Sequence, residues 1–192
     1  MGARQSDGSS FVTRPPDESA VLSVFGLDAL EASGIAVSAA DHVGVAVRDV
    51  DEAIGRYGRL FGIRQWRRIR FSCLAQYAGS VHRVTGTAAT GALGAMTLEV
   101  VAPGEGRWTA SDILAERGEC AYHVGFRVGD LARALAESRA AGLTPTLVGA
   151  DESGTPAFCY IESPQPTAVL IELVAERLPS SFLTEATTRT VK

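Results

Sequence analysis

The feature that most constrains this chain is a tripeptide, His-Val-Gly, that occurs twice. It occupies residues 42–44 and again residues 123–125. When the two copies are superimposed, Asp49 aligns with Asp130 and Ala53 aligns with Ala134. Recurrence of a motif together with its spacing indicates one structural unit that the chain uses twice.

Each copy begins with the pattern of a strand followed by a helix. Valine alternates with smaller or polar residues over 43–47, which is strand periodicity. Asp49 is placed to cap a helix, and Gly62 is placed to end it. The second copy repeats this order, with alternation over 124–128 and a helix that ends at Gly142.

Three further strand-like stretches follow the helix in each copy, and Gly, Pro, Ser and Asp clusters separate several of them. They are Gln65–Phe71, Val81–Gly86 and Ala95–Val101 in the first copy, and Thr144–Val148, Ala157–Glu162 and Ala168–Val174 in the second. Each copy therefore has the order βαβββ, which predicts an α+β fold.

These patterns divide the chain into five parts. They are an N-terminal extension at 1–40, a first module at 41–102, a linker at 103–120, a second module at 121–175 and a C-terminal tail at 176–192. Within the extension we expect 1–16 to be loose and 18–33 to form a short helix. The linker has room for a helical turn around 111–117.

Composition narrows the class of protein. The chain has 192 residues, of which 46% are hydrophobic, enough to bury a core. A net charge of −4 argues against a nucleic-acid partner, and no apolar run reaches the length of a membrane span. The N-terminus lacks the pattern of a secretory signal, so we expect a cytoplasmic protein. Cys73, Cys120 and Cys159 are then expected to be reduced thiols.

Four polar residues interrupt apolar strands at matching places in the two copies. His42 and His123 open the first strand of each copy, and Glu99 and Glu172 lie in the last strand of each. A polar side chain inside an apolar strand is costly if it stays alone. One shared cation would satisfy all four. Imidazole nitrogen and carboxylate oxygen suit a divalent ion such as Zn, Ni, Co, Mn or Fe.

The motifs resemble those of the vicinal oxygen chelate superfamily, which includes glyoxalase I, methylmalonyl-CoA epimerase, fosfomycin-resistance proteins and extradiol dioxygenases. The resemblance covers about 41–175 and rests on the segments at 41–47, 98–101, 116–119 with 122–126, and 169–174. It implies that two tandem βαβββ modules form a cupped, partly closed mixed sheet with helices outside. It also implies one metal ion, held by His42, Glu99, His123 and Glu172.

The local motifs are most similar to those of methylmalonyl-CoA epimerase. The resemblance implies a metal-dependent isomerase, epimerase or lyase that stabilises an enolate next to a carbonyl, on an acyl-CoA or a similar acid, with Glu172 as the base. Two features depart from the epimerases. They usually carry Gln where this chain has Glu99, and their second base is missing here, because no Asp or Glu lies between Glu52 and Glu99.

Other possibilities stay open at this stage. An extradiol-type ring-cleaving dioxygenase, an epoxide-opening transferase and a non-catalytic protein that binds a small molecule such as an antibiotic share this fold. Arg127, Tyr77 and His82 are weaker candidates for substrate binding. A basic run at 64–70 suits either a solvated strand edge or an anionic substrate tail such as CoA. Family habit favours a homodimer, with the site formed within one chain or across a swapped pair.

Overall fold

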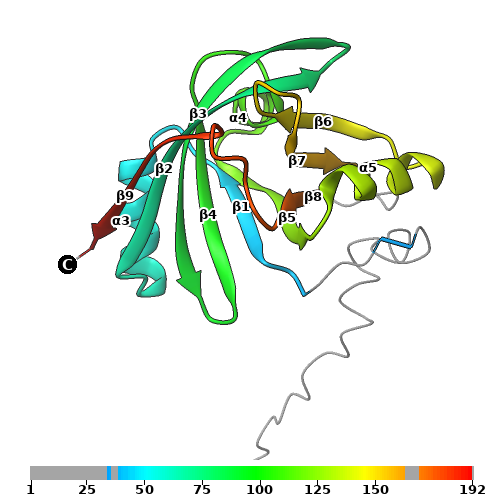
Figure 1. Cartoon of the computed structure of the whole chain (residues 1–192). Helices are drawn as coiled ribbons and strands as arrows, with labels where there is room; N and C mark the ends of the chain where they lie inside the picture. The colour runs from blue at the N-terminus through cyan, green and yellow to red at the C-terminus, as the bar shows by residue number, and fades with distance from the viewer. Residues whose placement is uncertain (1–33, 36–38, 163–168, 192) are drawn as a thin grey trace, which may run out of the picture.

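The computed structural model describes residues 34–35, 39–162 and 169–191. The short helix expected at 18–33 lies outside the described residues. Three helices and nine strands make up the described part (Figure 1). In chain order these are β1 (His42–Ala46), α3 (Val50–Phe61), β2 (Gln65–Tyr77), β3 (Ser80–Leu93), β4 (Met96–Pro103), α4 (Thr109–Arg117), β5 (Cys120–Val128), α5 (Leu131–Ala140), β6 (Pro145–Ala150), β7 (Pro156–Ile161), β8 (Leu170–Ala175) and β9 (Leu183–Thr190).

The strands form one mixed sheet that curves round on itself. The order of neighbours is β3-β4-β1-β5-β8-β7-β6-β2-β9, and β2 also pairs with β3. Eight strands therefore form a closed ring, and β9 lies beside β2 outside that ring. The two βαβββ modules and the α+β class are confirmed. The closure is more complete than the expected cup, because Leu74–Tyr77 of β2 pairs with β6 of the second module.

The helices cover the outside of the sheet (Figure 1). Helix α3 starts where the sequence predicts, since the Asp49 carboxylate accepts hydrogen bonds from the backbone N–H groups of Asp51 and Glu52. It ends at Gly62, whose φ of 70° is in the left-handed region that glycine adopts readily. Its buried side chains pack on β3 and β4. No helix in the described ranges is long and apolar enough to span a membrane.

Two parts of the fold were not predicted. Strands β2 and β3 extend well beyond the expected stretches and meet in a tight turn at Ala78 and Gly79, both with positive φ. The tail also contains a strand, β9, which pairs antiparallel with 65–71 of β2 (Figure 1). The edge of β2 is thus divided, with β9 on its first half and β6 on its last four residues.

The two modules meet along β1 and β5, which run antiparallel in the middle of the sheet. His42 is paired with Gly125, and Gly44 is paired with His123. The two copies of the tripeptide therefore face each other across one strand pair. This arrangement brings both histidines to the same place.

Candidate functional site

Four side chains from the two modules converge inside the ring of strands. They are His42 on β1, Glu99 on β4, His123 on β5 and Glu172 on β8, and one ligand atom of each lies within 4.8 Å of the others. His42 Nε2 is 3.0 Å from His123 Nε2 and 2.7 Å from Glu172 Oε2. His123 Nε2 is 3.4 Å from Glu99 Oε2. We call these four residues the His/Glu cluster.

Each histidine of the cluster lies against a glycine of the other module. A Cβ atom built on Gly44 would be 1.9 Å from Cε1 of His123, and one built on Gly125 would be 2.0 Å from Cε1 of His42. Any side chain at either glycine would occupy the place of an imidazole ring. The tripeptide thus supplies both parts of a reciprocal contact, a ring and the space for the other ring.

The cluster fits a divalent metal ion in spacing and in charge. Bonds of about 2.0–2.2 Å to one ion bring neighbouring donor atoms to about 3.0–3.5 Å from one another. The five distances between cluster atoms that involve a histidine nitrogen range from 2.7 to 3.7 Å. Two imidazoles and two carboxylates are also a donor set that Zn²⁺ and its neighbours in the first transition row accept.

A half-buried carboxylate outside the cluster orients His42. Asp41 Oδ2 lies 3.0 Å from His42 Nδ1, and Asp41 Oδ1 accepts a hydrogen bond of 2.7 Å from Arg127 Nε. Hydrogen bonding from Nδ1 to Asp41 leaves Nε2 of His42 facing the cluster, the arrangement seen around metal-bound histidines. His123 has no such support, because its buried Nδ1 has no hydrogen-bond partner among the described residues.

The carboxylates stabilise positive charge at this position. Burial alone would lower the pKa of His42, but hydrogen bonds to Asp41 and Glu172 raise that pKa from 6.5 to about 11. The hydrogen bond with His42 likewise holds the pKa of Asp41 at about 2, against the opposing effect of burial. Although burial disfavours its charge, the nearby His123 and His42 lower the pKa of Glu172. A cation is therefore the favoured occupant of the cluster.

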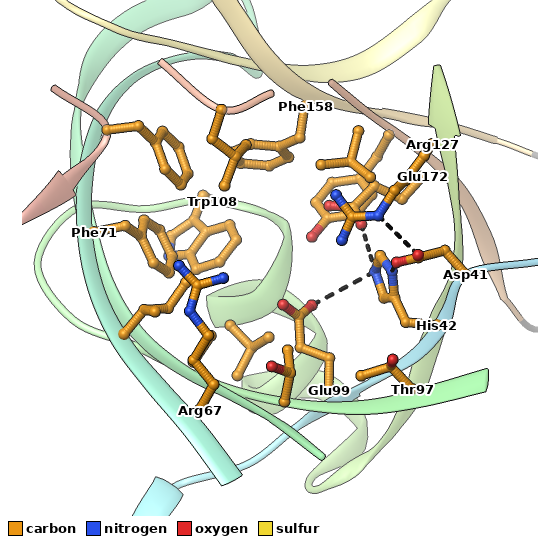
Figure 2. Close-up of a pocket in the computed structure, with 18 residues that line it drawn as sticks. Asp41, His42, Arg67, Phe71, Thr97, Glu99, Trp108, Arg127, Phe158 and Glu172 are labelled. Carbon is orange, nitrogen blue, oxygen red and sulfur yellow. Dashed lines mark hydrogen bonds and ion pairs between the residues drawn. The ribbon is translucent and has the colours of Figure 1, made fainter. Parts of the chain in front are cut away.

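The cluster forms one side of a cavity of about 170 Å³ (Figure 2). The opposite side is apolar and largely aromatic. Its lining includes Ile69, Phe71, Ala88, Val101, Trp108, Phe158, Tyr160, Val174, Leu178 and Phe182. The cavity is thus a pocket with one apolar and one polar end, the usual form of a small-molecule site. All of these groups come from one chain.

The structure separates the weaker candidates. Arg127 lines the cavity, where its guanidinium is bound to Asp41. Tyr77 and His82 are not among the residues that line it. The Tyr77 hydroxyl donates to Asp112, and His82 Nε2 lies 2.5 Å from the carbonyl oxygen of Arg107. Substrate binding by Arg127, Tyr77 and His82 stays a prediction, and the site described here does not depend on the latter two.

Comparison with known proteins assigns the chain to a family. The model of the Glyoxalase/Bleomycin resistance protein/Dioxygenase superfamily matches residues 41–160. The chain belongs to this superfamily. No curated protein matches the sequence. The superfamily assignment agrees with the resemblance found in the motifs around the two His-Val-Gly segments.

Solved structures of the same fold include two epimerases. Methylmalonyl-CoA epimerase from Mycobacterium tuberculosis has 24% sequence identity and a TM-score of 0.52, over 74% of this chain and 91% of that one. A Streptomyces coelicolor methylmalonyl-CoA epimerase variant in complex with 2-nitronate-propionyl-CoA has 20% identity and a TM-score of 0.51, over 73% and 98%. At these identities the likeness establishes the fold of this superfamily member and not its reaction.

Sequence reasoning missed several residues of this superfamily site. Asp41 directly precedes His42, and Gly44 and Gly125 align in the two copies of the tripeptide. Only the pairing of β1 with β5 shows that each glycine makes room for the histidine of the other copy. Phe182 lies in the tail, where no repeat marks it. Its hydrophobic neighbours Leu178 and Leu183 were the only signal in the sequence that this segment packs on the sheet.

Proposed function

We propose that this protein is a metal-dependent isomerase or lyase that removes a proton from a carbon next to a carbonyl group. One observation carries the proposal, the convergence of the His/Glu cluster at the polar end of an otherwise apolar cavity. Membership of the superfamily supports a metal-dependent reaction. His42, Glu99, His123 and Glu172 would hold the ion.

When bound, a divalent ion supplies Lewis-acid stabilisation of the negative charge that develops on a carbonyl oxygen. The remaining chemistry falls to the side chains. Glu172 is the proposed base, because its carboxylate lines the cavity and its lowered pKa keeps it unprotonated. To take up a proton it would have to leave the ion when the substrate binds. Tyr160 forms a hydrogen bond with Glu172 and lies 3.0 Å from the Tyr122 hydroxyl, so the carboxylate is also oriented.

The cavity favours chemistry with one base. Among the described residues, the carboxylates that line it are Asp41, Glu99 and Glu172. Asp41 is engaged by His42 and Arg127, and Glu99 and Glu172 both belong to the cluster, at one end of the cavity. An isomerase or lyase can return a proton through the same carboxylate that removed it. A two-base epimerase would need another acid on the opposite side of the substrate, so we favour the one-base reactions.

The test combines metal analysis with proton exchange. Protein loaded with Co²⁺ is incubated in deuterated water with 2-oxo acids and acyl-CoA thioesters, and deuterium incorporation next to the carbonyl is followed by mass spectrometry. We expect metal-dependent exchange that Glu172→Gln abolishes while the chain stays folded. Glu176→Gln is the matched control, because Glu176 is exposed and lies just beyond β8. Full exchange in Glu172→Gln would remove that carboxylate from the mechanism.

Other outcomes would point to the alternatives. Oxygen uptake with a catechol would indicate the ring-cleaving oxygenase, although Glu99 as a fourth donor suits that site poorly, since a facial triad needs two histidines and one carboxylate. Binding of a small molecule without metal or turnover would indicate a binding protein. A homodimer stays a prediction, and the proposal does not require one because one chain supplies the whole cluster.

A further inference from the structure

We propose that the cavity takes a small carboxylic acid with a flat aromatic body, such as an aryl-substituted 2-oxo acid, and not an acyl-CoA thioester. This inference rests on the proposed function for its carbonyl group. It is carried by two features outside the His/Glu cluster, a wall of fixed aromatic rings and an arginine without a partner.

The first feature is the aromatic wall, which we define as Phe71, Trp108, Phe158 and Phe182. The rings of Phe71 and Phe182 are stacked, with centroids 5.4 Å apart and planes 1° from parallel. Trp108 meets Phe71 edge to face at 5.7 Å, and Phe158 meets Phe182 at 5.9 Å. All four side chains are buried. Since these contacts suit further aromatic partners, the wall offers ring edges and faces to a flat ligand.

Two of these rings lie directly over glycines of the neighbouring strands. A Cβ on Gly86 would be 2.4 Å from Cζ of Phe71, and a Cβ on Gly149 would be 2.2 Å from Cε1 of Phe158. Each ring therefore fills the space that a side chain on the neighbouring strand would need. Burial and mutual contacts place the four rings before any ligand arrives, which reduces the entropy cost of binding.

The second feature is Arg67. Residues Arg67, Ile69 and Phe71 alternate along β2 and line the cavity. On the other face of the same strand, Arg68 and Arg70 pair with Asp51 and Glu185. The side chain of Arg67 forms no hydrogen bond or ion pair with any residue in the described ranges. Its guanidinium points into the space between Trp108 and Glu99 (Figure 2). A free guanidinium that lines the same cavity as the cluster suits a carboxylate.

The volume of the cavity limits the size of the ligand. A cavity of about 150 Å³ with apolar walls is large enough to hold benzene. A cavity of about 170 Å³ therefore accepts one aromatic ring and a few further atoms. The phosphopantetheine and nucleotide of CoA would lie outside the cavity and would make no contact with the aromatic wall. The C-terminal segment supplies Leu178 and Phe182 on this side, so the wall depends on residues beyond both modules.

Two probes separate the contributions of ring and carboxylate. Phenylpyruvate and pyruvate share the 2-oxo acid group and differ in the ring, and calorimetry gives the affinity of each for metal-free and Co²⁺-loaded protein. Burial of a phenyl group predicts about 10- to 100-fold tighter binding of phenylpyruvate. Equal affinities would overturn the inference. So would tighter binding of propionyl-CoA than of phenylpyruvate.

Variants assign each effect to its residue. We expect Phe182→Leu and Phe182→Ala to reduce the preference for phenylpyruvate over pyruvate, by about 10-fold in the alanine variant. We expect Phe61→Ala, at an exposed position on α3, to leave it unchanged. Arg67→Gln should weaken both acids by about 10-fold or more and preserve their ratio, whereas Arg70→Gln should not. Leucine at position 182 keeps most of the side-chain volume and removes the ring. If the preference for phenylpyruvate were unchanged in both Phe182 variants, the aromatic wall would not be the source of that preference.

The two proposals can fail separately. The preference for phenylpyruvate over pyruvate is also measured in metal-free protein, so this test of the aromatic ligand does not depend on the ion. Loss of metal-dependent deuterium exchange with both acids would refute the proposed function alone. A preference for pyruvate, with exchange intact, would refute the aromatic ligand alone.

Discussion

Gly44→Ala is the sharpest perturbation of the site, because it adds one methyl group and touches one ligand. The added Cβ would lie 1.9 Å from Cε1, 2.1 Å from Nε2 and 2.4 Å from Nδ1 of His123. The ring would have to retreat by about 1.5 Å to restore an ordinary contact of 3.4 Å. Metal sites tolerate about 0.2 Å of error in a ligand distance. We therefore expect His123 to be lost as a ligand.

The expected loss of metal affinity can be bounded from substitutions that disturb a metal site less. Loss of an outer partner, which leaves all ligands in place, typically costs 10- to 100-fold in metal affinity. Loss of an imidazole ligand should exceed this, so we expect Co²⁺ to bind Gly44→Ala more than about 100-fold more weakly. Overpacking should also lower the free energy of unfolding by about 1–3 kcal/mol. Circular dichroism and thermal melting establish that the variant folds.

The assay is calorimetric titration with Co²⁺, together with the visible absorption of the bound ion. Gly129→Ala is the matched control, since a Cβ at Gly129 meets nothing within 4 Å and its φ is not left-handed. Gly125→Ala should behave as Gly44→Ala does, because it displaces His42 in the same way. A Gly44→Ala protein with the affinity and spectrum of the wild type would refute the reciprocal seating of the histidines.

Four further predictions concern the same site and the thiols. Asp41→Asn should weaken Co²⁺ binding by about 10- to 100-fold, measured by chelator competition, because His42 loses its orienting carboxylate. Because the pKa of His42 is raised to about 11, metal binding at pH 7 should release a proton, and calorimetry in buffers of different ionisation enthalpy should detect it. The same raised pKa stabilises the metal-free fold fully below about pH 6.5, and this contribution should fade as the pH approaches 11. Iodoacetamide at pH 8 should modify the half-buried Cys120 and spare Cys73 and Cys159, whose burial raises their pKa values to about 11 and 12; equal labelling of all three by mass spectrometry would contradict this.

The repeat explains why much of the site could be predicted from the sequence. His42 and His123 were recognisable because two copies placed the same polar residue at the start of the same kind of strand. Glu99 and Glu172 were recognisable because each interrupts an apolar strand. Strand periodicity fixes which face a side chain takes. The structure places all four together, although their role as ligands stays a proposal.

Long-range pairing could not be predicted in this way. Arg67 and Arg70 belong to one basic run, and only the registers with β3 and β9 show that one faces the cavity and the other faces solvent. Tyr77 was expected near the site because it lies in the part of the chain where the epimerases carry their second base, but it stands at the end of β2 and does not line the cavity. The Thr- and Ala-rich β3 lacks clear alternation, which hid the length of the hairpin that it forms with β2.

The division of the β2 edge between β6 and β9 has a consequence for how the protein matures. Strand β9 is the last regular element of the chain, and it leaves the ribosome after every other strand. Until it docks, the ring of Phe71 has no stacking partner and one side of the cavity is open. Domains generally fold from the N-terminus during synthesis. The nascent chain can thus assemble its histidines and glutamates early, and it gains a sheltered compartment only after the segment with Phe182 and β9 has emerged.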